Sequence, residues 1–175
     1  MTLADNTASQ LLSSETQNVF SAYTQLTTDD KLALLYYIYE AMGEAITPAA
    51  PTAADPNLAP RLLGDFYNLP QEQQLAIMRQ IVNSEATDYS RAYGALGSNN
   101  QLLVWYGWAQ GMGDTVVDMP ADYQSTQSVN PVLDQIKQLE FQEQISLLRE
   151  IASRMGHTDV QPIPTQAETG KTSSL

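Results

Sequence analysis

Two short aromatic runs constrain the fold of this chain more than any other feature of its sequence. The first reads Leu-Leu-Tyr-Tyr-Ile-Tyr at residues 34–39, and the second reads Leu-Val-Trp-Tyr-Gly-Trp at residues 103–108. Both place aromatic residues at the same i, i+1, i+3 spacing after two aliphatic residues. A helix that is apolar on nearly every side lies in the middle of a structure, with other elements packed around it. The runs therefore predict two related, central helices, one in each half of the fold.

Capping patterns and apolar periodicity predict the other helices. The predicted caps are Ser14 (with Gln17), Thr27 (with Asp30), Thr87, Ser98 (with Gln101) and Asn130 (before Pro131). Apolar residues at helical spacing predict further helices at residues 62–69, after Pro70, and at residues 143–155 with Gly156 as a C-cap.

Prolines divide these helices from one another. The helix after Thr27 is expected to end near Ile46, before an Ala/Pro-rich connection at residues 47–60. The second aromatic helix is expected to run to about Val117, before Met119-Pro120. Strand patterns are scarce, so the predicted fold class is all-α, with seven or eight short helices.

Composition narrows the function classes. Eight Lys and Arg residues against 20 Asp and Glu residues give a net charge of −12, which predicts that the chain binds no nucleic acid. Cys is absent and His157 is the single histidine, which excludes thiolate catalysis and multi-histidine metal sites. The longest apolar stretch, at residues 32–46, contains two glutamates and is too short to cross a bilayer. We therefore expect a soluble protein without a signal peptide or transmembrane segment.

No metal site is predicted from the acidic residues. Glu40 and Glu44 lie one helical turn apart without a Glu-x-x-His partner, which favours a solvated helix edge. Asp114, Asp118 and Asp122 follow no calcium-loop spacing.

Two basic side chains near the end of the chain have open interpretations. Arg149 could form a surface ion pair with Glu150 or Asp159, or it could anchor a carboxylate of a partner. His157 follows a helix C-terminus, where a cation is favoured, and is interpreted as a capping residue rather than a catalyst.

The aromatic helices also have two readings. In each helix, five residues at helical spacing share one face. These are Leu32, Leu35, Tyr36, Tyr39 and Met42 in the first helix and Leu102, Trp105, Tyr106, Ala109 and Met112 in the second helix. Gly107, Gly111 and Gly113 indicate a close approach to the second helix, by another helix or by a flat ligand. The faces are either plain core or the walls of a groove for a long, apolar, conjugated ligand.

Three sequence segments resemble one protein family. Residues 26–43, Leu-Thr-Thr-Asp-Asp-Lys-Leu-Ala-Leu-Leu-Tyr-Tyr-Ile-Tyr-Glu-Ala-Met-Gly, resemble the first carotenoid-contacting helix of the orange carotenoid protein's N-terminal domain. Further similarity lies in Asn99-x-x-Leu102-x-x-Trp105-Tyr106, in Met119-Pro120-Ala-x-Tyr123-Gln, and in Gln144-Ile-x-x-Leu-Arg149 followed by Met155-Gly156. The resemblance covers residues 10–160 and ends before a second, sheet-containing domain, as in a free-standing helical carotenoid protein of cyanobacteria.

The resemblance implies two discontinuous, interleaved four-helix bundles with a keto-carotenoid between them: canthaxanthin, echinenone or 3'-hydroxyechinenone. It implies an N-terminal arm at residues 1–14, a carotenoid-binding domain at residues 15–157 and a flexible tail at residues 158–175. Its implied ligand contacts are Leu32, Leu35, Tyr36, Tyr39, Met42, Leu75, Met78, Leu102, Trp105, Tyr106, Ala109, Met112, Met119, Tyr123, Ile145, Arg149 and Met155. Tyr36 departs from the family, which commonly has Trp at that position.

The function that the resemblance implies is photoprotection by physical quenching of singlet oxygen, without enzymatic activity. Alternatives are quenching of the phycobilisome antenna, donation of carotenoid to a C-terminal-domain-like carrier, and a ligand-free helical interaction protein. A monomer or weak dimer in the cytoplasm is expected, with phycobilisomes as the link to thylakoid membranes. Asn99 and Arg149 match positions that face the second domain in the two-domain proteins.

Overall fold

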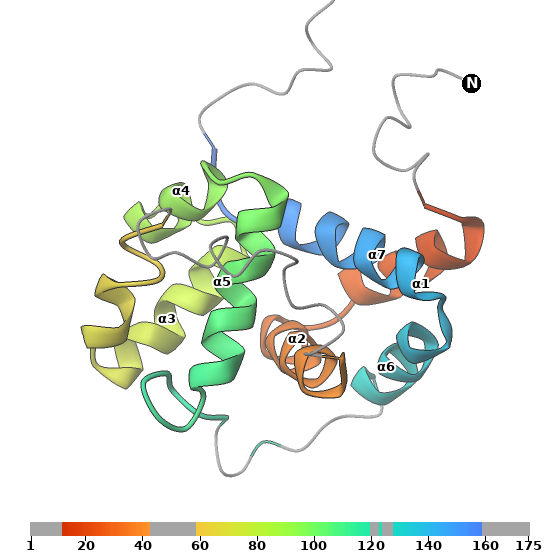
Figure 1. The fold of residues 1–175 in the computed structure, drawn as a ribbon, viewed down its shortest axis with the longest axis horizontal. Helices are drawn as coiled ribbons and strands as arrows, with labels where there is room; N and C mark the ends of the chain where they lie inside the picture. Colours follow the sequence, from red (N-terminus) through yellow and green to blue (C-terminus); the bar gives the residue numbers. More distant parts are fainter. Residues whose placement is uncertain (1–11, 43–58, 120–122, 124–127, 159–175) are drawn as a thin grey trace, which may run out of the picture.

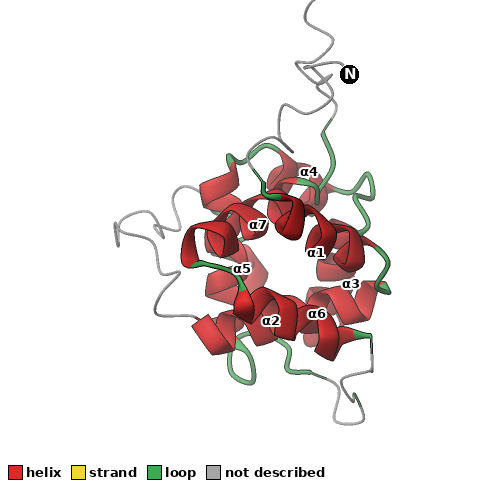
Figure 2. Cartoon of the chain, turned by 90° about the vertical axis from the view of Figure 1, so that its right-hand side faces the viewer, coloured by secondary structure: helices red, strands yellow, loops and turns green. Residues whose placement is uncertain are grey.

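The computed structural model describes residues 12–42, 59–119, 123 and 128–158, and within them the chain is helical. The elements are α1 (Ser14–Thr24), α2 (Thr28–Met42), the 3-10 helix η5 (Asp65–Asn68), α3 (Gln71–Val82), α4 (Asp88–Gly94), α5 (Ser98–Gly111), α6 (Val129–Gln138) and α7 (Phe141–Ser153). Figure 2 shows only helices and loops in these residues, where β pairing is limited to one isolated bridge between Met112 and Val116. The all-α prediction is confirmed.

The helices form two groups, and the chain visits one of them twice. Figure 1 shows α1, α2, α6 and α7 on one side and α3, α4 and α5 on the other. The short helix η5 and the turns around it complete the second group. Because the chain leaves the first group after α2 and returns at α6, the first group is discontinuous in sequence, and the second group is inserted between its two halves.

Both aromatic helices occupy the centre of this arrangement. α2 packs against α6 of its own group and against α3 and α5 of the other, while α5 packs against α2 and α7. Leu34 and Ile38 of α2 and Val104 of α5 are fully buried. Burial of each such aliphatic side chain stabilises the folded state by about 1.5–3 kcal/mol. The prediction of two central helices is therefore confirmed.

Two of the five predicted helix caps form as expected, and the other three are displaced. The hydroxyl of Thr27 accepts a hydrogen bond from the Asp30 backbone N–H at 3.2 Å, and that of Thr87 accepts one from Ser90 at 3.4 Å. For α1, the prediction of Ser14 as the cap is wrong by one residue, because the Ser13 hydroxyl accepts from the Thr16 backbone N–H at 3.1 Å.

The second aromatic helix differs from the prediction at both ends. Ser98 is the first helical residue rather than the cap, because Gln101 donates to the carbonyl of Tyr93 at 3.1 Å instead of reaching back to the helix start. The helix ends at Gly111, not near Val117, because Met112 leaves helical dihedral angles and Gly113 adopts a φ of +83°. A turn closed by a Gly113 N–H to Val116 carbonyl bond of 3.0 Å follows.

Other predicted boundaries shift for local reasons. Residues 62–69 form turns and η5 rather than an α-helix, since Gly64 departs from helical dihedral angles (φ −142°, ψ −79°). α6 begins at Val129 after the N-cap Ser128, so the prediction of Asn130 as the cap is wrong by two residues. Pro131 lies inside the first turn, where backbone N–H groups need no helical partner. The last helix begins at Phe141 rather than residue 143.

The end of α7 is held against the second group of helices. Gly156 adopts a φ of +81°, and its N–H donates to the carbonyl of Ile81 in α3 at 2.8 Å. The His157 backbone N–H donates to the carbonyl of Ser90 in α4 at 3.0 Å. The C-cap of α7 is Arg154, so the prediction of Gly156 as the cap is wrong by two residues, although Gly156 does adopt the left-handed conformation that glycine favours after a helix.

Several predicted features lie outside the described residues: the helix extension to Ile46, most of the Ala/Pro connection, the arm at residues 1–11 and the tail from residue 159. Among the described helices, none is long and apolar enough to cross a membrane.

Candidate functional site

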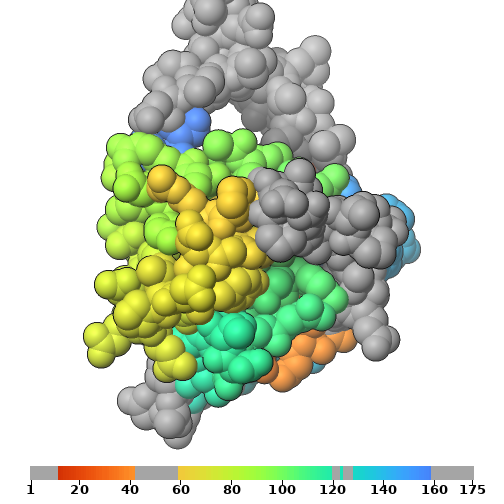
Figure 3. Space-filling model, turned by 60° about the vertical axis from the view of Figure 1, so that its left-hand side comes forward, coloured from red at the N-terminus to blue at the C-terminus, as the bar shows by residue number. Residues whose placement is uncertain are grey.

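A mainly apolar cleft lies where α2 of the first group faces α3 and α5 of the second. The segment at residues 112–119, together with Tyr123, closes one side of it. The cleft has a volume of about 80 Å³ and is open to solvent on one side. Figure 3 shows the outer face of this region, where residues 59–82 in gold and yellow-green adjoin the end of α5, with α2 in orange at the lower edge.

The α5 wall of the cleft consists of two indole rings that other elements hold in place. The Trp105 ring N–H donates to the Tyr93 hydroxyl at 2.9 Å, and the Trp108 ring N–H donates to the carbonyl of Leu62 at 2.9 Å. Trp108 also stacks on Phe66, with ring centroids 4.1 Å apart, and meets Trp105 edge-on at 5.1 Å. Both indoles are buried, so this wall has a fixed shape.

The α2 wall carries Tyr36 and Tyr39, which differ in their surroundings. The buried Tyr39 hydroxyl donates to the carbonyl of Leu102 at 2.9 Å, and burial raises the pKa of Tyr39. Tyr36 is half-buried and donates to Glu40, one turn along the same helix, at 3.0 Å. That hydrogen bond, with some burial, raises the pKa of Tyr36. Both phenols are therefore neutral at ordinary pH.

The segment after α5 is fixed by one buried amide, Gln74 of α3. Its side-chain nitrogen donates to the carbonyls of Phe66 and Thr115, at 3.0 and 2.9 Å. Its oxygen accepts from the Val117 backbone N–H at 2.7 Å. A fully satisfied buried amide gives a chain segment without regular structure a defined position. Gln74 thereby places Met112 and Val117 against the cleft.

Charged groups gather at the mouth near the N-terminal end of α2. Arg79 of α3 and Asp29 form a two-pronged ion pair, with Nε–Oδ1 at 2.9 Å and Nη2–Oδ2 at 3.1 Å. The hydrogen bond to Asp29 raises the pKa of Arg79. The Tyr123 hydroxyl donates to Asp30 at 2.7 Å, and burial together with this bond raises the pKa of Tyr123. Asp118 also lines the mouth.

The structure brings eleven of the seventeen predicted contact residues to this one cleft: Leu32, Leu35, Tyr36, Tyr39, Leu75, Met78, Trp105, Ala109, Met112, Met119 and Tyr123. The side chain of Met42 lies outside the described residues. The remaining five do not line the cleft, and their roles stay predictions.

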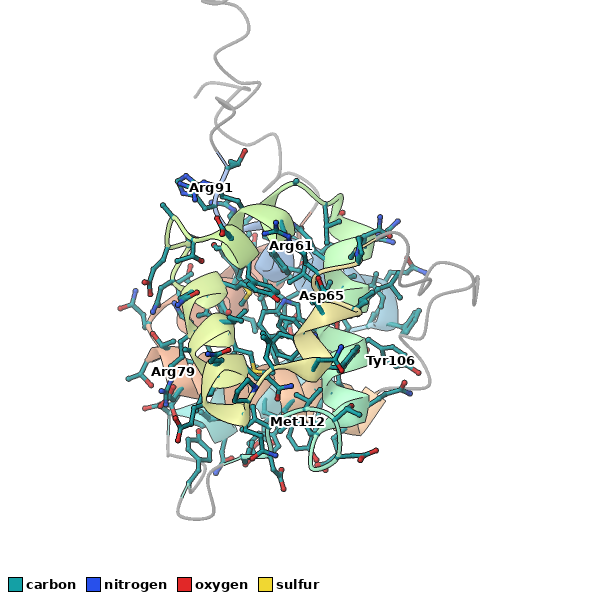
Figure 4. The ribbon with its side chains drawn as sticks, turned by 90° about the vertical axis from the view of Figure 1, so that its left-hand side faces the viewer. Arg61, Asp65, Arg79, Arg91, Tyr106 and Met112 are labelled. Carbon is teal, nitrogen blue, oxygen red and sulfur yellow. The ribbon has the colours of Figure 1, made fainter. Side chains whose placement is uncertain are left out.

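Those five residues lie in two places. Leu102 and Tyr106 are half-buried neighbours of the cleft, with the Tyr106 ring 6.1 Å from that of Tyr39. Figure 4 shows Tyr106 on the opposite side of the view from Arg79. Ile145, Arg149 and Met155 belong to α7 and the turn after it, where Met155 is part of the core.

Sequence reasoning missed six lining residues: Asp29, Ala33, Arg79, Trp108, Val117 and Asp118. For Trp108 a signal existed, because the two aromatic runs pair it with Tyr39 when Tyr36 is paired with Trp105. The predicted helix faces instead pair Tyr36 with Tyr106 and Tyr39 with Ala109, which is shifted by one residue from the alignment of the aromatic runs. The others depend on contacts between distant segments, which no local pattern carries.

The glycines of α5 are explained by the protein's own packing. A Cβ added at Gly107 would lie 3.2 Å from the side chains of Leu63 and Tyr67. At Gly111 it would lie 2.9 Å from a methyl group of Val116. The close approach that the sequence indicated is therefore made by the turns before α3 and after α5.

The acidic and basic candidates take ordinary structural positions. Within the described residues no group of three or more potential ligands could hold a metal ion, and Glu44 and Asp122 lie outside them. Of the alternatives for Arg149, the pair with Glu150 does not form, because Arg149 is hydrogen-bonded to Asn99 at 3.0 Å and Glu150 pairs with Arg154. The alternative partner Asp159 lies outside the described residues.

Comparisons with known proteins agree on one family. The model of the orange carotenoid protein N-terminal domain matches residues 9–158. An orange carotenoid-binding domain-containing protein of Nostoc sp. is 39% identical over 140 residues, which cover 79% of this chain and 82% of that protein. The orange carotenoid-binding protein of Synechocystis sp. is 35% identical over 137 residues, which cover 78% of this chain but 43% of that relative. The chain therefore spans less than half of the longer relative.

Solved structures agree with the fold. The red carotenoid protein of Anabaena (Nostoc) sp., solved with canthaxanthin, aligns with a TM-score of 0.71 and 35% identity, over 82% of this chain and 99% of that one. The orange carotenoid protein of the same organism, also with canthaxanthin, aligns with a TM-score of 0.76 and 28% identity, over 93% of this chain and 54% of that one.

Proposed function

Because the chain belongs to the family of the orange carotenoid protein N-terminal domain, we propose that it binds a carotenoid in the cleft between α2 and α5. The observation that carries the proposal is the lining of this cleft, where Leu, Met and aromatic side chains from both helix groups converge. Apolar walls suit a polyene, aromatic faces add about 0.5–1.5 kcal/mol per ring contact, and Met adapts to irregular shapes. The relatives are named for carotenoid binding rather than for a catalysed reaction.

The cleft follows α2, but its volume requires adjustment before it holds a long ligand. Its lining residues on α2 run from Asp29 to Tyr39, about 15 Å along the helix axis at a rise of 1.5 Å per residue. The cleft volume of about 80 Å³ is well below that of a typical small-molecule site, on the order of 300–1,000 Å³. Binding therefore separates the walls, and we expect the half-buried Tyr36 and Met119 to move more than the fixed indoles of α5.

The proposed activity is photoprotection by a keto-carotenoid such as canthaxanthin, echinenone or 3'-hydroxyechinenone. When bound, the long polyene accepts excitation energy from singlet oxygen and releases it as heat. The protein makes no covalent bond in this scheme. Its own residues hold the pigment in a dry, shaped site and keep it dispersed in water.

Expression in a carotenoid-producing host tests the proposal directly. We expect a coloured protein whose visible spectrum and extracted pigment identify a carotenoid held in about one-to-one ratio. The matched control is Trp105→Ala, which removes one of the two indoles of the α5 wall and is expected to reduce the pigment content. A colourless product that also fails to take up canthaxanthin in vitro would overturn the proposal.

Charge argues against antenna docking as a second function. Arg149 is exposed, with its Nε bonded to Asn99, but the chain as a whole carries a net charge of −12. Contact with an acidic antenna surface would bring like charges together. We therefore restrict the proposal to carotenoid binding and quenching of singlet oxygen.

A further inference from the structure

Almost every side-chain hydrogen-bond donor in the cleft wall already has a protein acceptor. Five of these side chains are a phenol or an indole, and each donates to a neighbouring protein atom at 2.7 to 3.0 Å: Tyr36, Tyr39, Trp105, Trp108 and Tyr123. None of these donors is available for a ligand unless its present bond breaks. The sixth donor-bearing side chain in the lining is Arg79.

Arg79 differs from the other five because part of its guanidinium is uncommitted. Its Nε and Nη2 are bonded to Asp29, and within the described part of the chain Nη1 has no hydrogen-bond partner. A guanidinium has a rigid, planar fork, so Asp29 fixes the direction in which the Nη1 N–H groups point. In Figure 4, Arg79 lies on the flank of α3, away from Arg91 at the top of the view.

The other charged groups at this mouth cannot donate. Asp29 and Asp118 are carboxylates, and an Asp118 oxygen accepts from the Met119 backbone N–H at 2.8 Å. Ionised carboxylates only accept hydrogen bonds, so they repel the oxygen of a ligand carbonyl. A ligand carbonyl at this mouth therefore has one favourable side-chain partner among the described lining residues.

We propose that Arg79 is a specificity-determining residue whose Nη1 donates a hydrogen bond to a ring carbonyl of the bound carotenoid. The proposal rests on the proposed function, which it deepens by assigning an orientation. The ketone-bearing ring lies at the charged mouth formed by Asp29 and Arg79, and the polyene runs toward Tyr39 and Trp105. The cleft thereby prefers carotenoids with a ring ketone over carotenoids that are pure hydrocarbons.

The size of the preference follows from the exposure of the donor. The Arg79 side chain is 44% exposed, so water competes for its N–H groups. We expect canthaxanthin, a diketone, to bind about 3- to 10-fold more tightly than β-carotene, which has no oxygen, through this bond. Asp29 acts as a positioning residue because it orients the donor without touching the ligand.

The experiment compares canthaxanthin and β-carotene as probes with the full chain and two variants. Arg79→Met keeps most of the aliphatic stem and removes all donors, while Arg91→Met removes an exposed arginine outside the cleft lining. We expect Arg79→Met to lower the ratio of the two affinities by about 3- to 10-fold and Arg91→Met to leave it unchanged. The infrared C=O stretch of bound canthaxanthin should shift upward in Arg79→Met alone, because the hydrogen bond is lost.

The outcomes separate this inference from the function on which it rests. If both pigments bind but Arg79→Met changes neither the affinity ratio nor the C=O stretch, the role of Arg79 is wrong while carotenoid binding stands. If neither pigment binds to the unmodified chain, both proposals fail. Because an exposed ion pair contributes about 1 kcal/mol or less to stability, Arg79→Met should fold, and its circular dichroism spectrum checks this.

Discussion

The helices α2 and α5 carry the same aromatic spacing in sequence but form walls of different character. In α5, the ring nitrogens of Trp105 and Trp108 bond to other elements, at Tyr93 and Leu62. In α2, Tyr36 is half-buried, and within the described residues its hydroxyl bonds to Glu40 of the same helix alone. The α5 wall is therefore fixed by tertiary contacts, whereas part of the α2 wall is held only locally.

This difference indicates how one sequence pattern can serve two mechanical roles. An indole fixed by a hydrogen bond and a stacked ring keeps its place when a ligand enters. A phenol whose only bond lies within its own helix can change rotamer without breaking a tertiary contact. We therefore expect α5 to determine stability and α2 to determine how closely the cleft adapts to its ligand.

The largest expected effect is a loss of stability when the α5 wall is disrupted. Trp108→Ala removes a buried indole, its stack on Phe66 and its bond to Leu62, and should lower the free energy of unfolding by about 3–5 kcal/mol. Tyr36→Ala, the control on the other wall, should cost under about 1 kcal/mol. Urea denaturation followed by circular dichroism measures both. Equal losses in the two variants would show that the walls do not differ.

A smaller effect depends on pH and distinguishes the two tyrosines of α2. Burial raises the pKa of Tyr39 above that of the unfolded chain, near 10, so the folded form retains a proton that the unfolded form loses. Stability is therefore unaffected below about pH 10 and falls above it, by about 1.4 kcal/mol per pH unit for each such tyrosine.

The matched variants separate Tyr39 from the other buried tyrosines. Burial also raises the pKa of Tyr23 and Tyr93, so the whole chain should lose stability above pH 10. Tyr39→Phe should make this loss shallower, and Tyr36→Phe should alter it less. Urea midpoints measured between pH 9 and 11 give the slopes. An unchanged slope in Tyr39→Phe would contradict the assigned difference in environment.

The smallest expected effect is a change in carotenoid affinity when Tyr36 of the α2 wall is substituted. Tyr36→Trp introduces the residue that the family resemblance implies at this position and enlarges the aromatic face toward the proposed ligand. We expect carotenoid affinity to rise by about 2- to 10-fold, with a change in the visible absorption maximum and little change in apo stability. Titrating each protein with pigment measures this affinity, and Tyr36→Phe serves as the control variant. A loss of affinity would indicate that Tyr36 is already the better fit.

The sequence was sufficient to predict the two central helices, because a continuous apolar run within each helix indicates that the helix is buried. Runs of apolar residues at 34–39 and 103–108 can be satisfied only by neighbours on several sides, and the structure supplies those neighbours. Helix ends were less predictable, since Ser13 rather than Ser14 caps α1 and Gly111 ends α5. Either serine could supply the oxygen, and only the packed backbone selects one.

The candidate site was predictable in its walls but not in its mouth. Leu, Met and Tyr residues at helical spacing identify most of the lining. Trp108 is missing from the predicted contacts because the two helix faces were aligned one residue out of register. Arg79 and Asp29 are 50 residues apart, and Gln74 and Val117 are 43 apart. Such pairs form only when the whole fold brings their helices together, so no local pattern reveals them.

The anchoring of Gly156 and His157 has a practical consequence for protein engineering. Their backbone N–H groups are fixed to Ile81 and Ser90, and a Cβ on Gly94 would lie only 2.1 Å from the His157 carbonyl oxygen. A reporter or surface tether joined directly after residue 158 would start from this docked turn beside α4. Arg91 of α4 and Met112 of the cleft lie at opposite ends of the view in Figure 4. Such a fusion would leave the proposed carotenoid cleft open to its surroundings, so a chain that binds pigment as proposed would serve as an immobilised, optically active module.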